Sequence, residues 1–89
     1  MTAREWDEAA VRVLVEQQFA QLLPDAGLRG ADNFFRRGGD SLGMMHMISA
    51  LNGHGLPLTA RDFVARPTPD GVVQSVMARL PGRADDRER

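Results

Sequence analysis

One stretch of this chain, Asp32–Leu42 with the sequence DNFFRRGGDSL, has residue types and a spacing that could do chemistry. Its two aromatics can anchor the stretch in a core, and its glycines let the backbone turn without a Cβ clash. Asp40 is a good helix N-cap, which places Ser41 in the first turn of the helix that follows. The Ser41 hydroxyl would then lie beside unsatisfied backbone N–H groups, where an anion is favourable. We expect the rest of the chain to be the scaffold that positions this serine.

The full stretch resembles the core motif Asp-Asn-Phe-Phe-x-x-Gly-Gly-Asp-Ser-Leu of the peptidyl, or aminoacyl, carrier proteins of nonribosomal peptide synthesis. The resemblance extends over roughly residues 3–80 and includes Pro67-Thr68. It implies that Ser41 carries a covalent 4′-phosphopantetheine derived from coenzyme A, with Gly39 and Asp40 beside the attachment point. The terminal thiol of that arm would hold an acyl group as a thioester, so the protein would be a group carrier and not an enzyme.

The same resemblance implies partners and a docking surface. The partners would be a phosphopantetheinyl transferase, an adenylation enzyme or domain, and condensation, thioesterase or tailoring enzymes. In the family, residues just after the serine face these partners, and they correspond to Leu42 and Met45 here. Arg37 lies near the same surface and stands where the family usually has leucine. Arg36 and Arg37 could attract the phosphate of the arm or an acidic partner, although a solvated loop is the simpler interpretation of the pair.

A hydrolase is a first alternative, because residues 39–43 (GDSLG) match the nucleophile-elbow pattern G-x-S-x-G and contain the Gly-Asp-Ser-Leu motif of an esterase family. Both enzyme types need a strand before the serine, a base and an oxyanion hole. No run of β-branched residues precedes Gly39, and neither His46 nor His54 has an aspartate three residues before it. These absences disfavour the hydrolase hypothesis.

The composition excludes several other classes of function. The chain has no cysteine, which rules out disulfides, thiolate nucleophiles and cysteine-based metal sites and favours the reducing cytoplasm. Eleven basic and 12 acidic residues give a formal charge of −1, which offers no electrostatic case for nucleic acid. No apolar run approaches the roughly 20 residues of a membrane span, and no signal-peptide pattern opens the chain. We therefore expect a cytoplasmic protein with no nucleic-acid, membrane or metal partner. Its oligomeric state is open from the sequence, with a monomer as the default.

A long first helix is expected before the motif. Thr2 and Glu5 have capping-box spacing, and no glycine or proline interrupts the chain from there to Leu23. Pro24 then ends a helix of about five turns. Its expected apolar face consists of Trp6, Ala10, Val11, Val13, Leu14, Val15, Phe19, Leu22 and Leu23. Residues 24–40 form a long connection, which Phe34 and Phe35 are expected to pin to the core.

The second helix is expected over Ser41–Asn52, with Gly53 and Gly55 ending it. One face, Met44, Met47, Ile48 and Leu51, has the spacing of a buried stripe. A second strip beside the serine contains Leu42, Met45 and Ser49. Either this helix is buried all round, or the strip is exposed and binds partners through adaptable methionine contacts.

Charge on this helix bears on the type of carrier. Residues 42–52 contain no Asp or Glu, whereas the carriers of fatty acid synthesis typically present an acidic second helix. Docking would then depend on apolar contact and shape rather than on electrostatic steering, which favours the peptide-synthesis type. A second alternative, from another class, is a helical protein–protein interaction domain that uses the same methionine face without a cofactor.

The remaining elements complete a small bundle. Thr59 is an N-cap signature for a short helix with Phe63 and Val64, and Thr68-Pro69 begins a last helix with an apolar face from Val72 to Leu80. The predicted fold is all-α, an acyl-carrier-type four-helix bundle of three main helices and one short one, with a long first loop. Residues 1–82 would form the carrier domain and the charged residues 83–89 a disordered tail. The start at Met1 and the end soon after the last helix fit a free-standing carrier, and an excised module of a larger synthetase would look similar.

Overall fold

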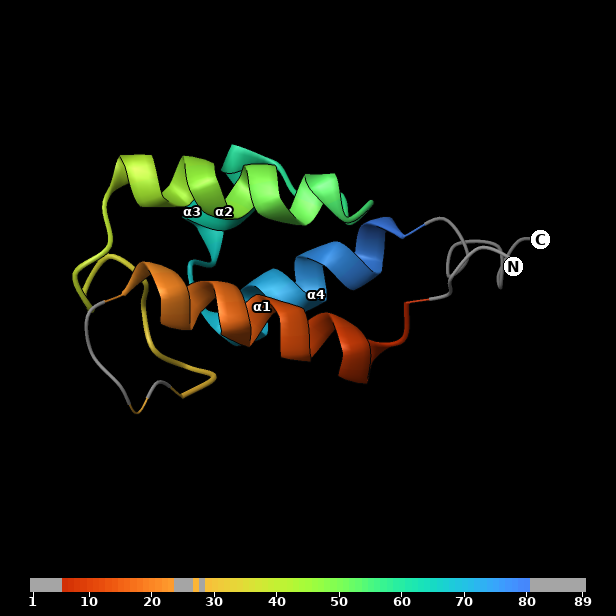
Figure 1. Ribbon diagram of the computed structural model, residues 1–89, viewed down its shortest axis with the longest axis horizontal. Coiled ribbons are helices and arrows are strands. Elements are labelled where there is room, and N and C mark those ends of the chain that lie inside the picture. Colours follow the sequence, from red (N-terminus) through yellow and green to blue (C-terminus); the bar gives the residue numbers. More distant parts are fainter. Residues whose placement is uncertain (1–5, 24–26, 28, 81–89) are drawn as a thin grey trace.

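Four helices make up the secondary structure in the computed structural model, which describes residues 6–23, 27 and 29–80. They are α1 (Glu8–Leu22), α2 (Ser41–Gly53), α3 (Ala60–Ala65) and α4 (Pro69–Arg79), and no strand occurs among the described residues. Helix α1 packs against α2 and α4, and the short α3 contacts both α2 and α4 (Figure 1). The expected all-α bundle of three main helices and one short helix is confirmed.

Side-chain caps set where the helices begin. The expected caps are confirmed at Asp40 for α2, Thr59 for α3 and Thr68 for α4, and α3 has a full capping box with Asp62. Helix α1 differs from the prediction. Its N-cap is Asp7, whose Oδ1 accepts the Ala10 N–H at 2.8 Å.

The predicted start of the first helix is therefore wrong for Trp6 and Asp7, which precede α1. The reason is a competing cap: an aspartate followed by an acidic residue, Glu8, is a strong helix start in its own right. The predicted capping box of Thr2 and Glu5 lies outside the described residues.

The core lies between the helices and is filled by apolar side chains from all four helices, the long loop and the link between α2 and α3. Its buried members are Val11, Leu14, Val15, Phe19, Leu23, Phe34, Met47, Leu51, Leu56, Leu58, Phe63, Val72, Val73, Val76, Met77 and Leu80. Two residues of the predicted α1 face, Ala10 and Val13, are exposed instead. At 3.6 residues per turn Val13 lies about 200° round the helix from Val11, so the buried stripe of α1 is narrower than predicted.

The long connection is held against the helices at several points. The Phe34 ring is fully buried and meets Phe19 and Phe63 edge-on. The Phe34 N–H donates to the Pro67 carbonyl at 2.7 Å. Nearby, the Asn33 side chain accepts two backbone N–H groups and shapes the turn. Phe35 is 38% exposed, although its ring contacts Phe34 and Phe63, so it anchors the loop only in part.

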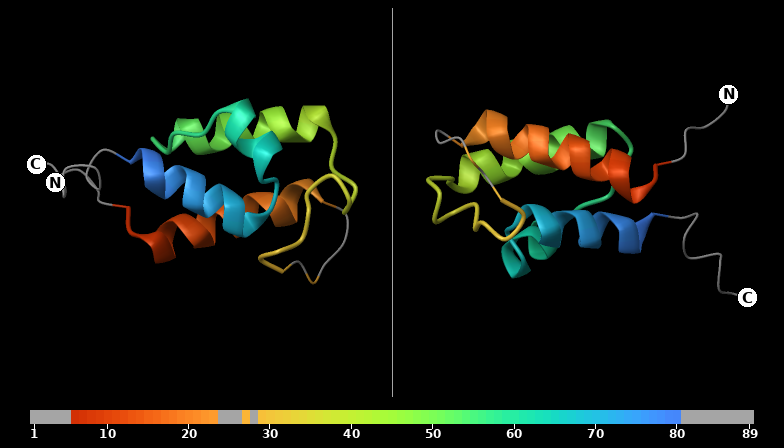
Figure 2. Two further views of the ribbon diagram at one scale, coloured as in Figure 1. Left: turned by 180° about the vertical axis from the view of Figure 1, so that it is seen from behind. Right: turned by 90° about the horizontal axis from the view of Figure 1, so that it is seen from below.

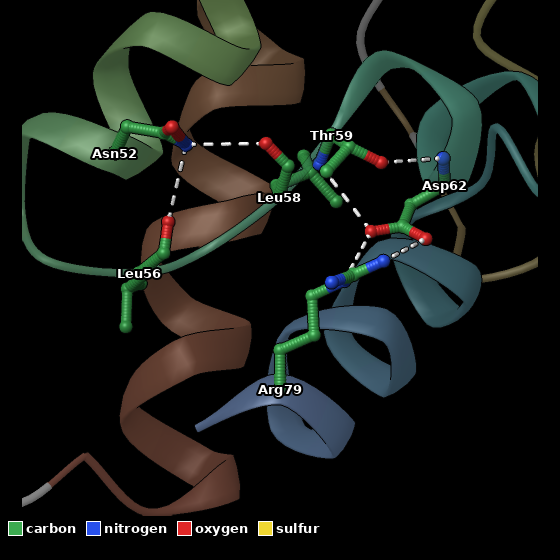
Figure 3. Close-up of polar contacts among 6 residues, drawn as sticks. All are labelled: Asn52, Leu56, Leu58, Thr59, Asp62 and Arg79. Carbon is green, nitrogen blue, oxygen red and sulfur yellow. Dashed lines mark hydrogen bonds and ion pairs between the residues drawn. The ribbon is translucent and has the colours of Figure 1, made fainter. Parts of the chain in front are cut away.

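Polar contacts join the link between α2 and α3 to α2, and join α3 to α4 (Figure 3). The Asn52 side-chain amide donates to the carbonyls of Leu56 and Leu58, both at 3.3 Å. The Asp62 carboxylate accepts two hydrogen bonds from Arg79, of 2.6 and 3.2 Å. This guanidinium, aided by the Thr59 N–H and hydroxyl, lowers the pKa of Asp62 below its usual value, against a smaller opposing effect of burial. The contact between Asp62 and Arg79 holds α3 against α4.

Candidate functional site

Ser41 is the first residue of α2 and is exposed to solvent. The preceding Asp40 has an extended backbone, and its Oδ1 accepts the Gly43 N–H at 2.9 Å. Its carbonyl accepts the Met44 N–H at 2.9 Å. With Asp40 as N-cap, the N–H groups of Ser41 and Leu42 belong to the first turn, which has no intrahelical acceptors. The hydroxyl therefore lies at the positive end of the helix dipole.

Glycine is needed at each of the two positions before Asp40, for different structural reasons. Gly38 has a φ of 106°, which side-chain-bearing residues rarely adopt. Gly39 donates its N–H to the Phe34 carbonyl at 2.9 Å, and a Cβ on Gly39 would overlap the Phe34 ring. The turn before Ser41 is thus folded directly over a buried aromatic ring.

The two arginines of the turn have different surroundings. Arg37 forms an ion pair with Asp32 of 2.9 Å, and about a quarter of each side chain is exposed. Asp32 also accepts the Arg29 N–H at 2.7 Å. Arg36 is exposed and has no ion-pair partner in the part of the chain that the structure describes. Arg37 therefore helps to hold the loop, and its predicted role in docking is a separate matter that stays a prediction.

The strip of α2 beside Ser41 is exposed. Leu42 is 64% and Met45 54% exposed, whereas Met47 and Leu51 are buried. This excludes a helix buried all round. The large exposed hydrophobics described also include Phe35 in the turn before α2 and Val64 on α3, two elements that adjoin α2 (Figure 2).

The geometry argues against a serine hydrolase. No strand precedes the serine anywhere in the described residues, although both enzyme patterns require one. His46, five residues on, is about 140° round α2 from Ser41. Among the described residues neither His46 nor His54 hydrogen-bonds the Ser41 hydroxyl. Within this part of the chain, neither histidine is therefore placed to act as a general base on the Ser41 hydroxyl.

The described residues provide neither a membrane-spanning helix nor a metal-binding cluster. Over the ranges that the structure describes, each helix is too short or too polar to cross a membrane. The same residues contain no cluster of three His, Cys, Asp or Glu that could hold a metal ion.

The family model of the phosphopantetheine attachment site matches residues 12–76, which include α2 and most of the bundle. This chain belongs to that family. It is a carrier protein, not an enzyme, and its cofactor is a covalently attached 4′-phosphopantetheine derived from coenzyme A. No curated protein matches the sequence of this carrier.

Among solved structures, the carrier is similar to a chain of the complex of the phosphopantetheine transferase Sfp with coenzyme A and a peptidyl carrier protein. The two chains are 24% identical, with a TM-score of 0.70 over 89% of this chain and 100% of the other. At this identity the similarity supports the fold, and the expected acyl-carrier-type bundle is confirmed.

Proposed function

We propose that Ser41 is the residue to which 4′-phosphopantetheine is attached. Its position carries this proposal. The chain has three serines, and Ser49 and Ser75 lie within α2 and α4, whereas Ser41 begins a helix. Among the three serines, only Ser41 therefore has its hydroxyl at a helix start; the hydroxyls of Thr59 and Thr68 also lie at helix starts, but each accepts a backbone N–H as the cap of its helix. The N–H groups at the start of α2 favour the negative charge of a phosphodiester on Ser41 Oγ.

The attachment needs little from the carrier itself. A transferase supplies the Mg²⁺, the coenzyme A and the base, and the carrier presents an accessible Oγ. As the new O–P bond forms, the Oγ proton passes to that base, the P–O bond of the coenzyme A pyrophosphate breaks, and adenosine 3′,5′-bisphosphate leaves. Asp40 and Gly39 fix where this Oγ lies, Asp40 by capping the first turn and Gly39 by its contact with the Phe34 ring. The arm then supplies the thiol that the cysteine-free chain lacks. A phosphopantetheinyl transferase is the first partner, in keeping with the complex that contains the similar structure.

The cargo that we propose is an aminoacyl, peptidyl or acyl thioester, carried between the enzymes of nonribosomal peptide or related natural-product synthesis. The lack of any Asp or Glu in residues 42–52 of α2 supports this type over the fatty-acid type. Leu42 and Met45 would dock adenylation, condensation, thioesterase or tailoring enzymes by apolar contact, with Arg37 at the rim.

The remaining parts of the proposal concern the form of the protein. We propose a discrete cytoplasmic monomer, with a carrier domain over residues 1–82 and a charged tail over residues 83–89. The absence of cysteine supports a reducing compartment. The tail lies outside the described residues.

Intact-protein mass tests the attachment. The wild type is incubated with coenzyme A, Mg²⁺ and a broad-specificity phosphopantetheinyl transferase, beside Ser41→Ala and the control Ser49→Ala. The wild type and the control should each gain one phosphopantetheine, and Ser41→Ala should gain none while unfolding at the wild-type temperature. Loading of Ser41→Ala, or no loading of folded, unmodified wild type, would contradict the proposal.

A further inference from the structure

The Phe34 ring lies under the first turn of α2, between the two glycines that flank Ser41 at two residues' distance. A Cβ on Gly39 would overlap this ring. A Cβ on Gly43 would lie 3.0 Å from Phe34 Cζ and 3.6 Å from Phe34 Cε2. The first of these distances is shorter than an ordinary van der Waals contact. One side of the turn that presents Ser41 thus lies directly against the Phe34 ring.

This ring cannot move aside easily. It is fully buried, and Phe19, Phe35 and Phe63 surround it with centroid distances of 5.2 to 5.6 Å. Its backbone is held on both sides, by the bond from its N–H to Pro67 and by the bond from Gly39 N–H to its carbonyl. Close-packed interiors transmit such constraints, so a new atom on Gly43 would displace α2 rather than the ring.

Gly43 is otherwise unfavourable for the stability of α2. A helix with glycine in its interior is less stable than one with alanine, because glycine loses more backbone entropy when it is ordered. Gly53, at the other end of the same helix, has no atom within 4 Å of where its Cβ would be. The two glycines of α2 therefore differ in one respect that matters: Gly43 faces a ring and Gly53 faces open space.

We propose that Phe34 and Gly43 are positioning residues, which together fix the place of Ser41 for the transferase. The inference rests on the proposed role of Ser41 and adds what determines the reactivity of that serine. The Phe34 ring packs against the start of α2. Because Gly43 has no side chain, the first turn of α2 can contact this ring. Neither residue touches the cofactor chemistry itself.

Gly43→Ala and the matched control Gly53→Ala test this proposal. Loading is followed with coenzyme A and a phosphopantetheinyl transferase, together with thermal unfolding. A displacement of 1 Å can cost about 100-fold in rate, so a shift of a few tenths of an ångström should lower the kcat for Gly43→Ala by roughly three- to tenfold. The KM for the carrier should change little, and Gly53→Ala should load at the wild-type rate.

Phe34→Leu removes the ring atoms that face Gly43 and completes a double-mutant cycle. Phe34→Leu alone should load slowly because the turn loses its support. The double variant Phe34→Leu/Gly43→Ala should load faster than either single variant, although the smaller core residue makes it less stable than Gly43→Ala. Loading that recovers while stability falls is not expected if the pair matters only for packing.

Two results would overturn the positioning role: a wild-type loading rate for Gly43→Ala, or rate effects that simply add in the cycle. Both leave the attachment site intact as long as Ser41→Ala fails to load. If Ser41→Ala loads, the attachment proposal itself is wrong. Circular dichroism of each variant shows that the compared proteins are folded.

Discussion

The carboxylate of Asp40 accepts the backbone N–H of Gly43 at 2.9 Å, so the residue before Ser41 closes the turn that Ser41 begins. Asp40→Ala removes this cap and should lower the free energy of unfolding by about 1 kcal/mol. Asp40→Asn keeps an acceptor oxygen and should lose much less. Urea denaturation of the two variants measures the difference, and equal losses would show that the charge of Asp40 matters more than its hydrogen bond.

The two adjacent phenylalanines should differ in their contribution to stability. Phe34 is fully buried and Phe35 is 38% exposed. Phe34→Ala should cost about 3–5 kcal/mol, the range for a buried aromatic. Phe35→Ala removes partly exposed area and edge-on ring contacts and should cost about 1–2 kcal/mol. Equal midpoint shifts in urea would mean that the two rings are equally buried.

Stability should fall in acid through Asp62. Its pKa is lowered in the folded state by Arg79, so this pair stabilises the fold above the unfolded aspartate pKa of about 3.9. The contribution is lost as the pH falls through the lower, folded pKa. The wild type should exceed Asp62→Asn in free energy of unfolding at pH 6, and the gap should narrow below about pH 4. A gap that stays constant down to pH 2.5 would contradict this linkage.

The exposed strip of α2 should matter for transfer and not for folding. Leu42→Ala and Met45→Ala remove exposed side chains and should change the free energy of unfolding by less than about 0.5 kcal/mol. We expect the KM for loading by the transferase to rise. Val13→Ala is the matched control, because Val13 is 57% exposed but lies on α1. An equal rise in KM for Val13→Ala would show that α2 is not the docking element.

Local signals made the helices and the serine predictable from sequence. Asp40, Thr59 and Thr68 each bond a backbone N–H three residues ahead, so a short window contains the whole interaction. The start of α1 was missed because Thr2 and Asp7 are both acceptable caps, and sequence alone does not rank them. Val13 was misplaced because an apolar residue at a helix surface looks the same in sequence as one in the core.

Contacts between distant residues were not predictable. Arg12 pairs with Asp70, 58 positions away, and Arg79 with Asp62, 17 away, and no periodicity links such partners. Gly43 is the instructive case at the site. From sequence, Gly43 is only a residue that weakens a helix. The structure explains why a glycine is present there, because the fold places the Phe34 ring next to it.

The two ends of the bundle differ, because the start of α2 lies at the end opposite to the start of α1 and the end of α4 in every view (Figures 1 and 2). Ser41 is the first residue of α2. A fusion, surface linkage or label joined at the start of α1 or the end of α4 would therefore attach at one end of the bundle and leave the end that contains Ser41 accessible. A carrier immobilised in this way should still accept its arm at the free end. This arrangement suits the protein to use as a tethered component, in which cargo is exchanged at one end of the bundle and the tether is attached at the other.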